Sequence, residues 1–303
     1  MRKKPVNDCL ILLTIKELRH KALAKNELQM NSTPKKCSLI FSTYNWPEAL
    51  ELCMKSIFAQ TVLPTEIIIA DDGSTEKTKQ MIDSLRSQTT IPIKHIWHKD
   101  VGFTKTIILN EAIRISTTDY IIQTDGDIIL HPKFIEEHLS VAAPKVFIRG
   151  SRALINKETT EKILKSKSIH VNFFTSGLQN RMNSLYSPVL SNILHKIKGL
   201  GSKYSLLGCN FSYWKKDFIE VNGYNNDILG WGHEDTELAA RLIHNGVANR
   251  TLKYKSICFH LHHNLNSKDK EAANIETRAV TIQKKLTTCE NGYTNKHEVT
   301  IWE

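Results

Sequence analysis

The sequence has no apolar run close to the roughly 18 consecutive residues that a membrane-spanning helix requires. It has no internal repeat, no low-complexity tract, and no pair of cysteines in the Cys-x-x-Cys spacing of a structural zinc site. The six cysteines are dispersed, at positions 9, 37, 53, 209, 258 and 289. We therefore expect a chain that crosses no membrane and keeps its thiols free in a reducing compartment.

The first residues resemble an export signal only in their charge. Residues 1–4 are basic, but the apolar stretch at 9–13 is too short for a signal peptide, and 16–25 is highly charged. We expect no export signal and a cytoplasmic location, at most peripheral on the inner face of the plasma membrane. Residues 8–25 are basic and amphipathic, which fits either a surface helix on anionic lipid or a loosely attached extension.

The composition is that of an ordinary globular protein. Apolar residues make up 41% and charged residues 24% of the 303 positions, which excludes a wholly disordered or collagen-like chain. This length allows two ordinary domains or one large α/β domain with extensions. The net charge of +10 favours an anionic partner, such as nucleic acid, nucleotide phosphates or an acidic membrane surface.

Short apolar segments alternate with helical patterns in the first half of the chain. We expect strands at 38–43, 66–70, 91–97 and 120–124, and helices at 47–60, 75–87 and 103–115. This alternation predicts an α/β fold with a mainly parallel sheet and helices on both faces. Ligands of such sheets bind at the carboxyl ends of the strands, where polar residues gather in this sequence.

The alternation stops after 146–148, and a second organised block runs from 206 to 263, with a strand expected at 253–259. We divide the chain accordingly into an N-terminal extension, an α/β half, a variable region, a second organised block and a C-terminal tail. Their boundaries are 1–36, 37–150, 151–204, 205–265 and 266–303.

Acidic residues follow two of the expected strands. Asp125-Gly126-Asp127 places two carboxylates where a strand ends, which suits one hard divalent cation, although the same pattern occurs in solvated turns. Asp71 and Asp72 stand before Gly73, where they could accept hydrogen bonds from a nucleobase or a ribose. The alternative for this second motif is a tight turn that leads into a helix cap.

A third cluster, Gly230-Trp231-Gly232-His233-Glu234-Asp235, leads into an expected helix. The indole of Trp231 could stack on a sugar ring. Glu234 and Asp235 are either partners of the helix dipole or a repelling pair, in which one raised pKa improves a general base.

Histidines gather after the expected strand at 253–259. His260 and His262, two residues apart on a strand, would point to one face and could share a metal site. A surface histidine cluster without a metal is the alternative.

The order of these motifs resembles the family 2 glycosyltransferases of the GT-A fold. The resemblance rests on Thr43-Tyr44-Asn45, Asp71-Asp72-Gly73-Ser74, Gly102-Phe103 with Asn110, and Asp125-Gly126-Asp127. Gly208-Cys209-Asn210 followed by the cluster at 230–235 is similar to the galactosyltransferase-type half of β-1,4-galactosyltransferases and bacterial chondroitin-type polymerases. Together the motifs span about residues 37–265. The resemblance implies a GT-A nucleotide-binding sheet with a smaller acceptor-side subregion.

The resemblance also implies a role for each matching residue. Donor binding falls to Thr43, Tyr44, Asp71, Asp72, Lys105, Asp125, Asn210 and Trp231, with Asn210 lining the sugar pocket. Asp127 would bind Mn²⁺ or Mg²⁺, with His260 as the distal ligand and His263 as a second choice. Asp235 would be the catalytic base, and Glu234 would contact a sugar.

These roles predict an inverting, metal-assisted transfer from a UDP-sugar to a glycan hydroxyl, including lipid-linked acceptors of bacterial surface polysaccharide or lipopolysaccharide synthesis. The basic stretches 8–25 and 189–203 favour peripheral membrane contact, although 189–203 could equally be an acceptor lid. The rival interpretations are a sugar-nucleotide pyrophosphorylase and a non-catalytic nucleotide- or nucleic-acid-binding protein. A pyrophosphorylase would need a Gly-rich loop with Arg and Lys after the first strand, and residues 43–47 do not have this composition. The lysines are scattered along the chain, which argues against a nucleic-acid partner.

Overall fold

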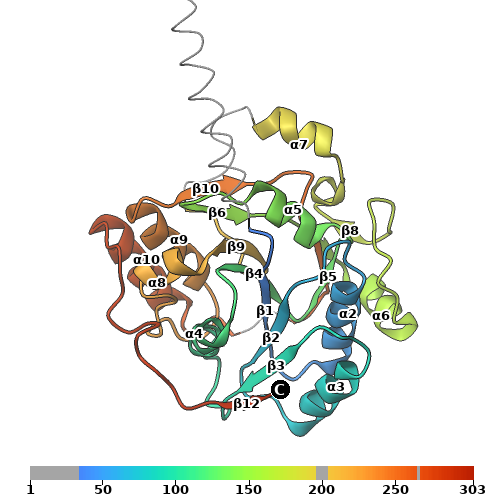
Figure 1. Cartoon of the computed structure of the whole chain (residues 1–303), viewed down its shortest axis with the longest axis horizontal. Helices are drawn as coiled ribbons and strands as arrows, with labels where there is room; N and C mark the ends of the chain where they lie inside the picture. The colour runs from blue at the N-terminus through green and yellow to red at the C-terminus, as the bar shows by residue number, and fades with distance from the viewer. Residues whose placement is uncertain (1–33, 196–203, 265–266) are drawn as a thin grey trace, which may run out of the picture. The chain divides into compact units, whose positions relative to one another are not determined.

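The apolar strands predicted from the sequence form the centre of the protein. The structure, a computed structural model, describes residues 34–195, 204–264 and 267–303 (Figure 1). Four strands lie parallel in the order β4-β1-β2-β3. They are β1 (Ser38–Thr43), β2 (Glu66–Asp71), β3 (Ile93–Trp97) and β4 (Tyr120–Asp125). The strand and helix bounds expected in this half agree with the structure to within two residues at each end.

Later segments extend this sheet to eight strands. β9 (Asn210–Trp214) pairs antiparallel with β4, and β12 (Thr300–Trp302) pairs antiparallel with β3. β6 (Val146–Arg149) joins β9, and β10 (Ala248–Thr251) joins β6. The sheet is therefore mixed around a parallel core, and it combines strands from both halves of the sequence.

Helices cover both faces of the sheet because alternate residues of each strand are apolar on opposite sides. Leu39 and Phe41 of β1 pack with α2 (Pro47–Phe58) and α3 (Glu76–Arg86), whereas Ile40 packs on the opposite face. That face carries α4 (Lys105–Ile115), α8 (Lys215–Glu220) and α9 (Glu234–His244), which Figure 1 shows gathered on one side of the sheet. Burial on both faces explains why these strands read as continuous apolar runs.

A second sheet of four strands lies in the order β5-β11-β7-β8. Its strands are β5 (Ile128–Leu130), β7 (Ser151–Ile155), β8 (Leu178–Gln179) and β11 (Ile257–His260). The start of the strand expected at 253–259 is wrong, because Tyr254 and Ser256 have φ angles of 62° and 45° and cannot be part of an extended strand. β11 consequently begins at Ile257 and ends at His260, where Leu261 N donates to Asp127 O at 3.0 Å.

The remaining helices lie around these sheets. They are α5 (Phe134–Val141), α6 (Lys157–Ser166), the 3₁₀ helix η1 (Arg181–Ser184), α7 (Pro188–His195) and α10 (Glu271–Gln283). The segment expected as a tail contributes α10, whose Thr281 hydroxyl donates to Glu237 of α9 at 2.9 Å. Lys196, Lys198 and Lys203 of the expected stretch 189–203, and all of 8–25, lie outside the described residues.

No helix among the described residues combines the length and hydropathy needed to cross a membrane.

Candidate active site

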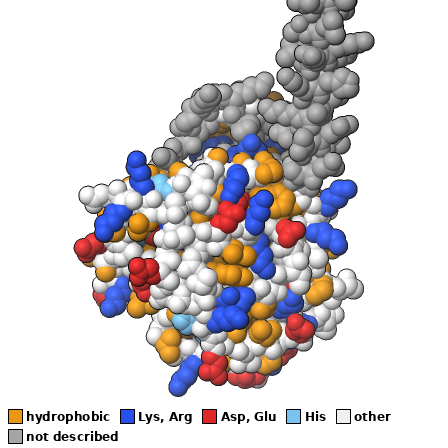
Figure 2. All heavy atoms as spheres, turned by 60° about the vertical axis from the view of Figure 1, so that its left-hand side comes forward, with side chains coloured by type: hydrophobic (Ala, Val, Ile, Leu, Met, Phe, Trp, Pro, Cys, Tyr) orange, Lys and Arg blue, Asp and Glu red, His pale blue; other side chains and the backbone are white. Residues whose placement is uncertain are grey.

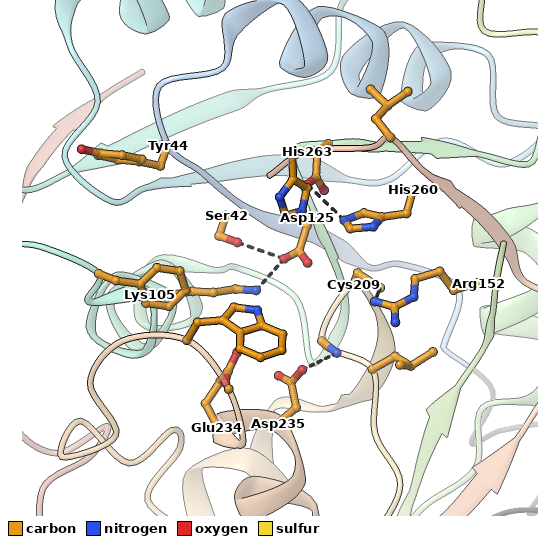
Figure 3. Close-up of a pocket in the computed structure, with 18 of the residues that line it drawn as sticks. Ser42, Tyr44, Lys105, Asp125, Arg152, Cys209, Glu234, Asp235, His260 and His263 are labelled. Carbon is orange, nitrogen blue, oxygen red and sulfur yellow. Dashed lines mark hydrogen bonds and ion pairs between the residues drawn. The ribbon is translucent and has the colours of Figure 1, made fainter. Parts of the chain in front are cut away.

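A cleft of about 950 Å³ opens where β1 and β4 end, between the two sheets and the start of α9 (Figure 3). Of the residues assigned to a site from the sequence, the cleft lining includes all except Asp71 and Asn210. The assigned residues in the lining are Thr43, Tyr44, Asp72, Lys105, Asp125, Asp127, Trp231, Glu234, Asp235, His260 and His263. Strand ends thus concentrate the polar side chains at one edge of the fold, as expected for an α/β sheet.

Asp127 lies between two imidazoles in this cleft. His260 Nε2 is 3.1 Å and His263 Nε2 is 3.4 Å from Asp127 Oδ2, and ligand atoms of the three residues lie within 4.8 Å of one another. Burial opposes ionisation of Asp127, but the nearby charges of His260, His263 and Lys105 outweigh it and lower its pKa. The partner of His260 in this cluster is His263, not His262, because β11 ends at His260 and the two-residue strand period no longer applies.

Asp125 is held by its neighbours at the end of β4. Ser42 Oγ donates to its Oδ1 at 3.0 Å, and Lys105 Nζ lies 2.7 Å from the same oxygen. Burial disfavours the charged form of Lys105, but Asp125, Asp235 and Glu234 together raise its pKa above the usual value. Lys105 therefore stays positively charged between the strand-end carboxylates and those of α9.

The two acids of the Asp71-Asp72 motif have different positions. Asp72 lines the cleft, where its carboxylate accepts from Thr104 N at 3.0 Å and lies 2.8 Å from His98 Nε2. Asp71 is 1% exposed and does not line the cleft. Its carboxylate accepts from Ser74 N and lies against His95, so Asp71 shapes the turn, and its role in donor binding stays a prediction without a contact in the cleft.

Tyr44 lies at the rim, beyond the end of β1. Its side chain is 52% exposed, and its hydroxyl donates to Asp100 Oδ2 at 2.8 Å. Thr43 lines the cleft beside it. This rim offers an aromatic face next to hydrogen-bonding groups.

Asn210 does not line the cleft, so the prediction that it lines the sugar pocket has no contact in the cleft to support it. It begins β9, is fully buried, and its Nδ2 donates to Ser151 O and Ser256 O at 2.9 and 2.7 Å. His138 Nε2 lies 2.9 Å from its Oδ1. Asn210 thereby ties the two sheets together beneath the cleft, a role that the motif alone could not distinguish from ligand contact.

Glu234 and Asp235 open α9 on the other wall of the cleft. The preceding backbone turns through positive φ angles at Gly230, Gly232 and His233, of 70°, 105° and 72°. This turn brings the first residues of the helix to the cleft. Glycine adopts such angles without steric cost, which explains the two glycines of the motif.

The two carboxylates differ in their surroundings. Asp235 Oδ2 accepts from Gly208 N at 2.7 Å, which fixes its orientation. Burial, followed by the neighbouring Asp235, raises the pKa of Glu234 to about 7. Burial also raises the pKa of Asp235, although Lys105 opposes the shift. The pair therefore combines one oriented carboxylate with one that is readily protonated near neutral pH.

Trp231 lies at the mouth of the cleft with 36% of its surface exposed, and Lys268 Nζ is 5.5 Å from its ring. A half-exposed indole at the entrance of a polar cleft suits the apolar face of a sugar ring.

Arg152 of β7 and Cys209 are among the lining residues that sequence reasoning did not select. Cys209 stands inside the recognised Gly208-Cys209-Asn210 motif and could have been selected from it. Arg152 lies in a segment without a motif, and only the pairing of β7 with β11 brings it into the cleft.

Comparisons with known proteins agree with this arrangement. Two solved structures share the fold: a mannosyltransferase from Pyrobaculum calidifontis in complex with GDP-Man and Mn²⁺, and S. aureus TarS. Their TM-scores are 0.53 and 0.50 and their sequence identities 14% and 16%. The alignments cover 82% and 81% of this chain and 63% and 39% of those chains. The fold is therefore that of the GT-A glycosyltransferases.

The sequence places the chain more narrowly. Residues 38–218 match the model of glycosyl transferase family 2, and residues 190–264 match the N-terminal domain of galactosyltransferase. The first match spans more than half of the chain, so the chain belongs to glycosyltransferase family 2.

Curated relatives are longer proteins. Chondroitin synthase of Escherichia coli is 24% identical over 71% of this chain and 33% of its own length. Validoxylamine A glucosyltransferase of Streptomyces hygroscopicus subsp. limoneus is 22% identical over 69% of this chain and 48% of its own length. The chain thus spans between a third and a half of these relatives.

Proposed function

We propose that the protein is an inverting glycosyltransferase that moves a sugar from a UDP-sugar to a hydroxyl of a glycan. One observation carries the proposal: the cluster of Asp127, His260 and His263 shares a cleft with a carboxylate oriented by Gly208 N–H. Such a cleft pairs a site for a diphosphate with a site for a proton acceptor.

The donor set of the cluster fits a divalent metal ion. One carboxylate and two imidazoles suit Mn²⁺, and Asp127 Oδ1 is buried without a hydrogen-bond partner among the described residues. Such an ion, when bound, neutralises charge that develops on the diphosphate leaving group. A relative of the same fold was solved with GDP-Man and Mn²⁺, which supports Mn²⁺ over Mg²⁺.

The chain's own residues supply the rest of the mechanism. Asp235 accepts the proton of the attacking hydroxyl, and the Gly208 N–H keeps its second oxygen in place. Attack on the face opposite the departing UDP inverts the anomeric carbon in a single displacement. Glu234 and Trp231 would contact the acceptor or the donor sugar.

The rim around Tyr44 supports the choice of a nucleotide donor. We assign the base and ribose to Thr43, Tyr44 and Asp72, which line this end of the cleft. Uracil is the base that the motif resemblance favours. A hexosyl or N-acetylhexosaminyl donor and a glycan acceptor, including a lipid-linked one, complete the proposal. Membership of family 2 and the similarity to a chondroitin synthase support glycosyl transfer.

A non-catalytic nucleic-acid-binding role is less well supported. On the face drawn in Figure 2, lysine and arginine side chains are spread among acidic and apolar ones rather than gathered in a stripe. The cleft itself contains the carboxylates of Asp125, Asp127, Glu234 and Asp235, which repel phosphates unless a metal ion is bound, as proposed here for the diphosphate of the donor.

The test is donor binding followed by transfer. We expect UDP with Mn²⁺ to raise the melting temperature by several degrees near 100 times Kd, and UDP or Mn²⁺ alone to raise it less. A panel of UDP-sugars with glycan acceptors then identifies the transferred sugar and the configuration of the product. Retention of configuration would contradict the single displacement. Formation of UDP-sugar from UTP and sugar 1-phosphate would instead support the pyrophosphorylase.

A further inference from the structure

Arg152 is a cation in the cleft to which the proposed function gives no role. It projects from β7 toward Cys209 (Figure 3). Its Nη1 lies 3.6 Å from Cys209 Sγ. A thiol sulfur is a weak acceptor, so this contact leaves most of the guanidinium N–H groups available to a ligand.

The charge of Arg152 has no ion-pair partner in the part of the chain that the structure describes. Lys105, the other long-chain cation in the lining, is 2.7 Å from Asp125, whereas no described carboxylate lies within 4.0 Å of the Arg152 guanidinium. A partly buried guanidinium loses hydration that an anion must replace. Its planar, forked donors match a carboxylate or a phosphate in a bidentate geometry.

The position of Arg152 favours the sugar end of the donor over the diphosphate end. Arg152 contacts Cys209, the residue after Gly208, and the Gly208 N–H orients the Asp235 carboxylate. In the metal cluster, by contrast, Asp127 Oδ2 faces His260 and His263. Arg152 also lies beside Cys209, which is 2% exposed, whereas Trp231 at the mouth is 36% exposed. If the acceptor enters the cleft past Trp231, the donor sugar occupies the buried end of the cleft, beside Cys209 and Arg152.

We propose that Arg152 binds a carboxylate on the transferred sugar, so that the donor is a nucleotide-linked uronic acid rather than a neutral hexose. The proposal rests on the proposed glycosyl transfer, and it replaces the neutral hexosyl or N-acetylhexosaminyl donor proposed above with a hexuronic acid. A neutral hexose would leave the guanidinium beside the sugar without an anionic partner. The free-energy cost of the unpaired guanidinium discriminates between donors that differ only at C6.

The experiment compares matched ligands that differ only in this carboxylate. Binding of UDP-glucuronate, UDP-glucose and UDP is measured by calorimetry with Mn²⁺, and the galacturonate and galactose pair is measured in the same way. We expect the uronate to bind at least about tenfold tighter than its neutral partner. In Arg152→Gln this ratio should fall to near one, and in Arg152→Lys to an intermediate value. Lys162→Gln, on the exposed side of α6, is the control that keeps the wild-type ratio.

Other outcomes would overturn the proposal. Equal weakening of UDP, UDP-glucose and UDP-glucuronate in Arg152→Gln would assign Arg152 to the diphosphate. A ratio of uronate to neutral-sugar affinity that is the same in Arg152→Gln as in wild type would also contradict the proposal. A ratio near one in wild type would contradict it as well. Glucuronic acid 1-phosphate and glucose 1-phosphate, compared by ligand-observed NMR, separate the two proposals. If glucuronic acid 1-phosphate binds more tightly than glucose 1-phosphate and Arg152→Gln removes this difference, the assignment of Arg152 is supported. This holds even if UDP does not bind and the proposed nucleotide donor is wrong.

Discussion

Asp127 is the residue that ties the metal hypothesis to particular atoms. Its Oδ2 faces both histidines, and its Oδ1 is buried without a partner among the described residues. Burying a carboxylate oxygen in this way is costly unless a ligand occupies the site. The cluster therefore has the properties of a prepared cation site rather than of a solvated turn.

We expect Asp127→Ala to abolish metal-dependent transfer and Mn²⁺ binding while the fold is retained, because the side chain faces the cleft. Calorimetric titration with Mn²⁺ and circular dichroism measure the two effects. Asp269→Ala, at an exposed position, is the matched control. Wild-type turnover of Asp127→Ala in manganese buffer would contradict the assignment.

Asp235→Asn should lower kcat by about 10²- to 10⁴-fold and leave UDP affinity close to that of the wild type. The amide oxygen can still accept from Gly208 N–H but cannot take up the proton. Steady-state kinetics and UDP titration separate the two effects. A loss of UDP affinity as large as the loss of rate would show that Asp235 binds the donor instead.

Glu234 should make stability depend on pH. Burial and Asp235 raise its pKa to about 7 in the folded state, above its ordinary value of 4.5. The folded state then holds a proton that the unfolded state has lost, so this contribution to stability is present below about pH 4.5 and is lost as the pH rises to about 7. Glu234→Gln should therefore gain stability relative to wild type over this range.

Denaturant unfolding at a series of pH values measures this difference. Glu161→Gln, on the exposed surface of α6, is the control that should follow the wild-type curve. Parallel curves for Glu234→Gln and wild type would refute the raised pKa.

Among the elements, the position of Asp235, the proposed base, depends on the close approach of the segment before β9 to the N-terminus of α9. A Cβ added to Gly208 would lie 2.4 Å from Asp235 Oδ1, closer than non-bonded atoms approach. The glycine is needed at this position because the Asp235 carboxylate occupies the space of a side chain.

We expect Gly208→Ala to displace the Asp235 carboxylate and lower kcat by roughly the factor that loss of a general base produces, about 10²-fold or more. The KM for the donor should change less. Gly246→Ala is the control, because Gly246 has a φ of 80° and no atom within 4 Å of an added Cβ, so strain alone should lower stability. Equal kcat values for the two variants would disprove the steric explanation.

At the scale of the whole molecule, α7 presents apolar side chains to solvent. Val189, Leu190 and Ile193 are 69%, 42% and 55% exposed. Together with the net charge of +10, this surface supports the proposal of peripheral contact with an anionic membrane.

Binding to anionic liposomes should therefore fall steeply with salt, since each basic residue near the surface contributes about 1 kcal/mol that ions screen. The double variant Val189→Ser with Ile193→Ser should sediment less with the vesicles than wild type. Leu63→Ser, at another exposed leucine between α2 and β2, is the control. No sedimentation of wild type at low salt would leave the acceptor-lid interpretation of this stretch.

The parallel core of the sheet and the position of the acidic motifs follow from the amino-acid sequence alone. Apolar runs such as Ser38–Thr43 and Glu66–Asp71 can be stable only as strands buried on both faces, and residues such as Asp72, Asp125 and Asp127 then lie at or just beyond their carboxyl ends. These are local effects of hydrophobic periodicity and strand direction, so they could be predicted without coordinates.

Which polar side chains line the cleft depends on contacts between segments that are distant in the sequence. Asp71 and Asn210 have side chains of the kind that bind ligands, but both make buried hydrogen bonds within the protein. Asp71 accepts from Ser74 N, and Asn210 donates to Ser151 O. The pairing of His260 with His263 follows from the end of β11, and Arg152 enters the cleft only because β7 pairs with β11. These outcomes depend on contacts between segments distant in the chain, and side-chain periodicity within one segment carries no information about them.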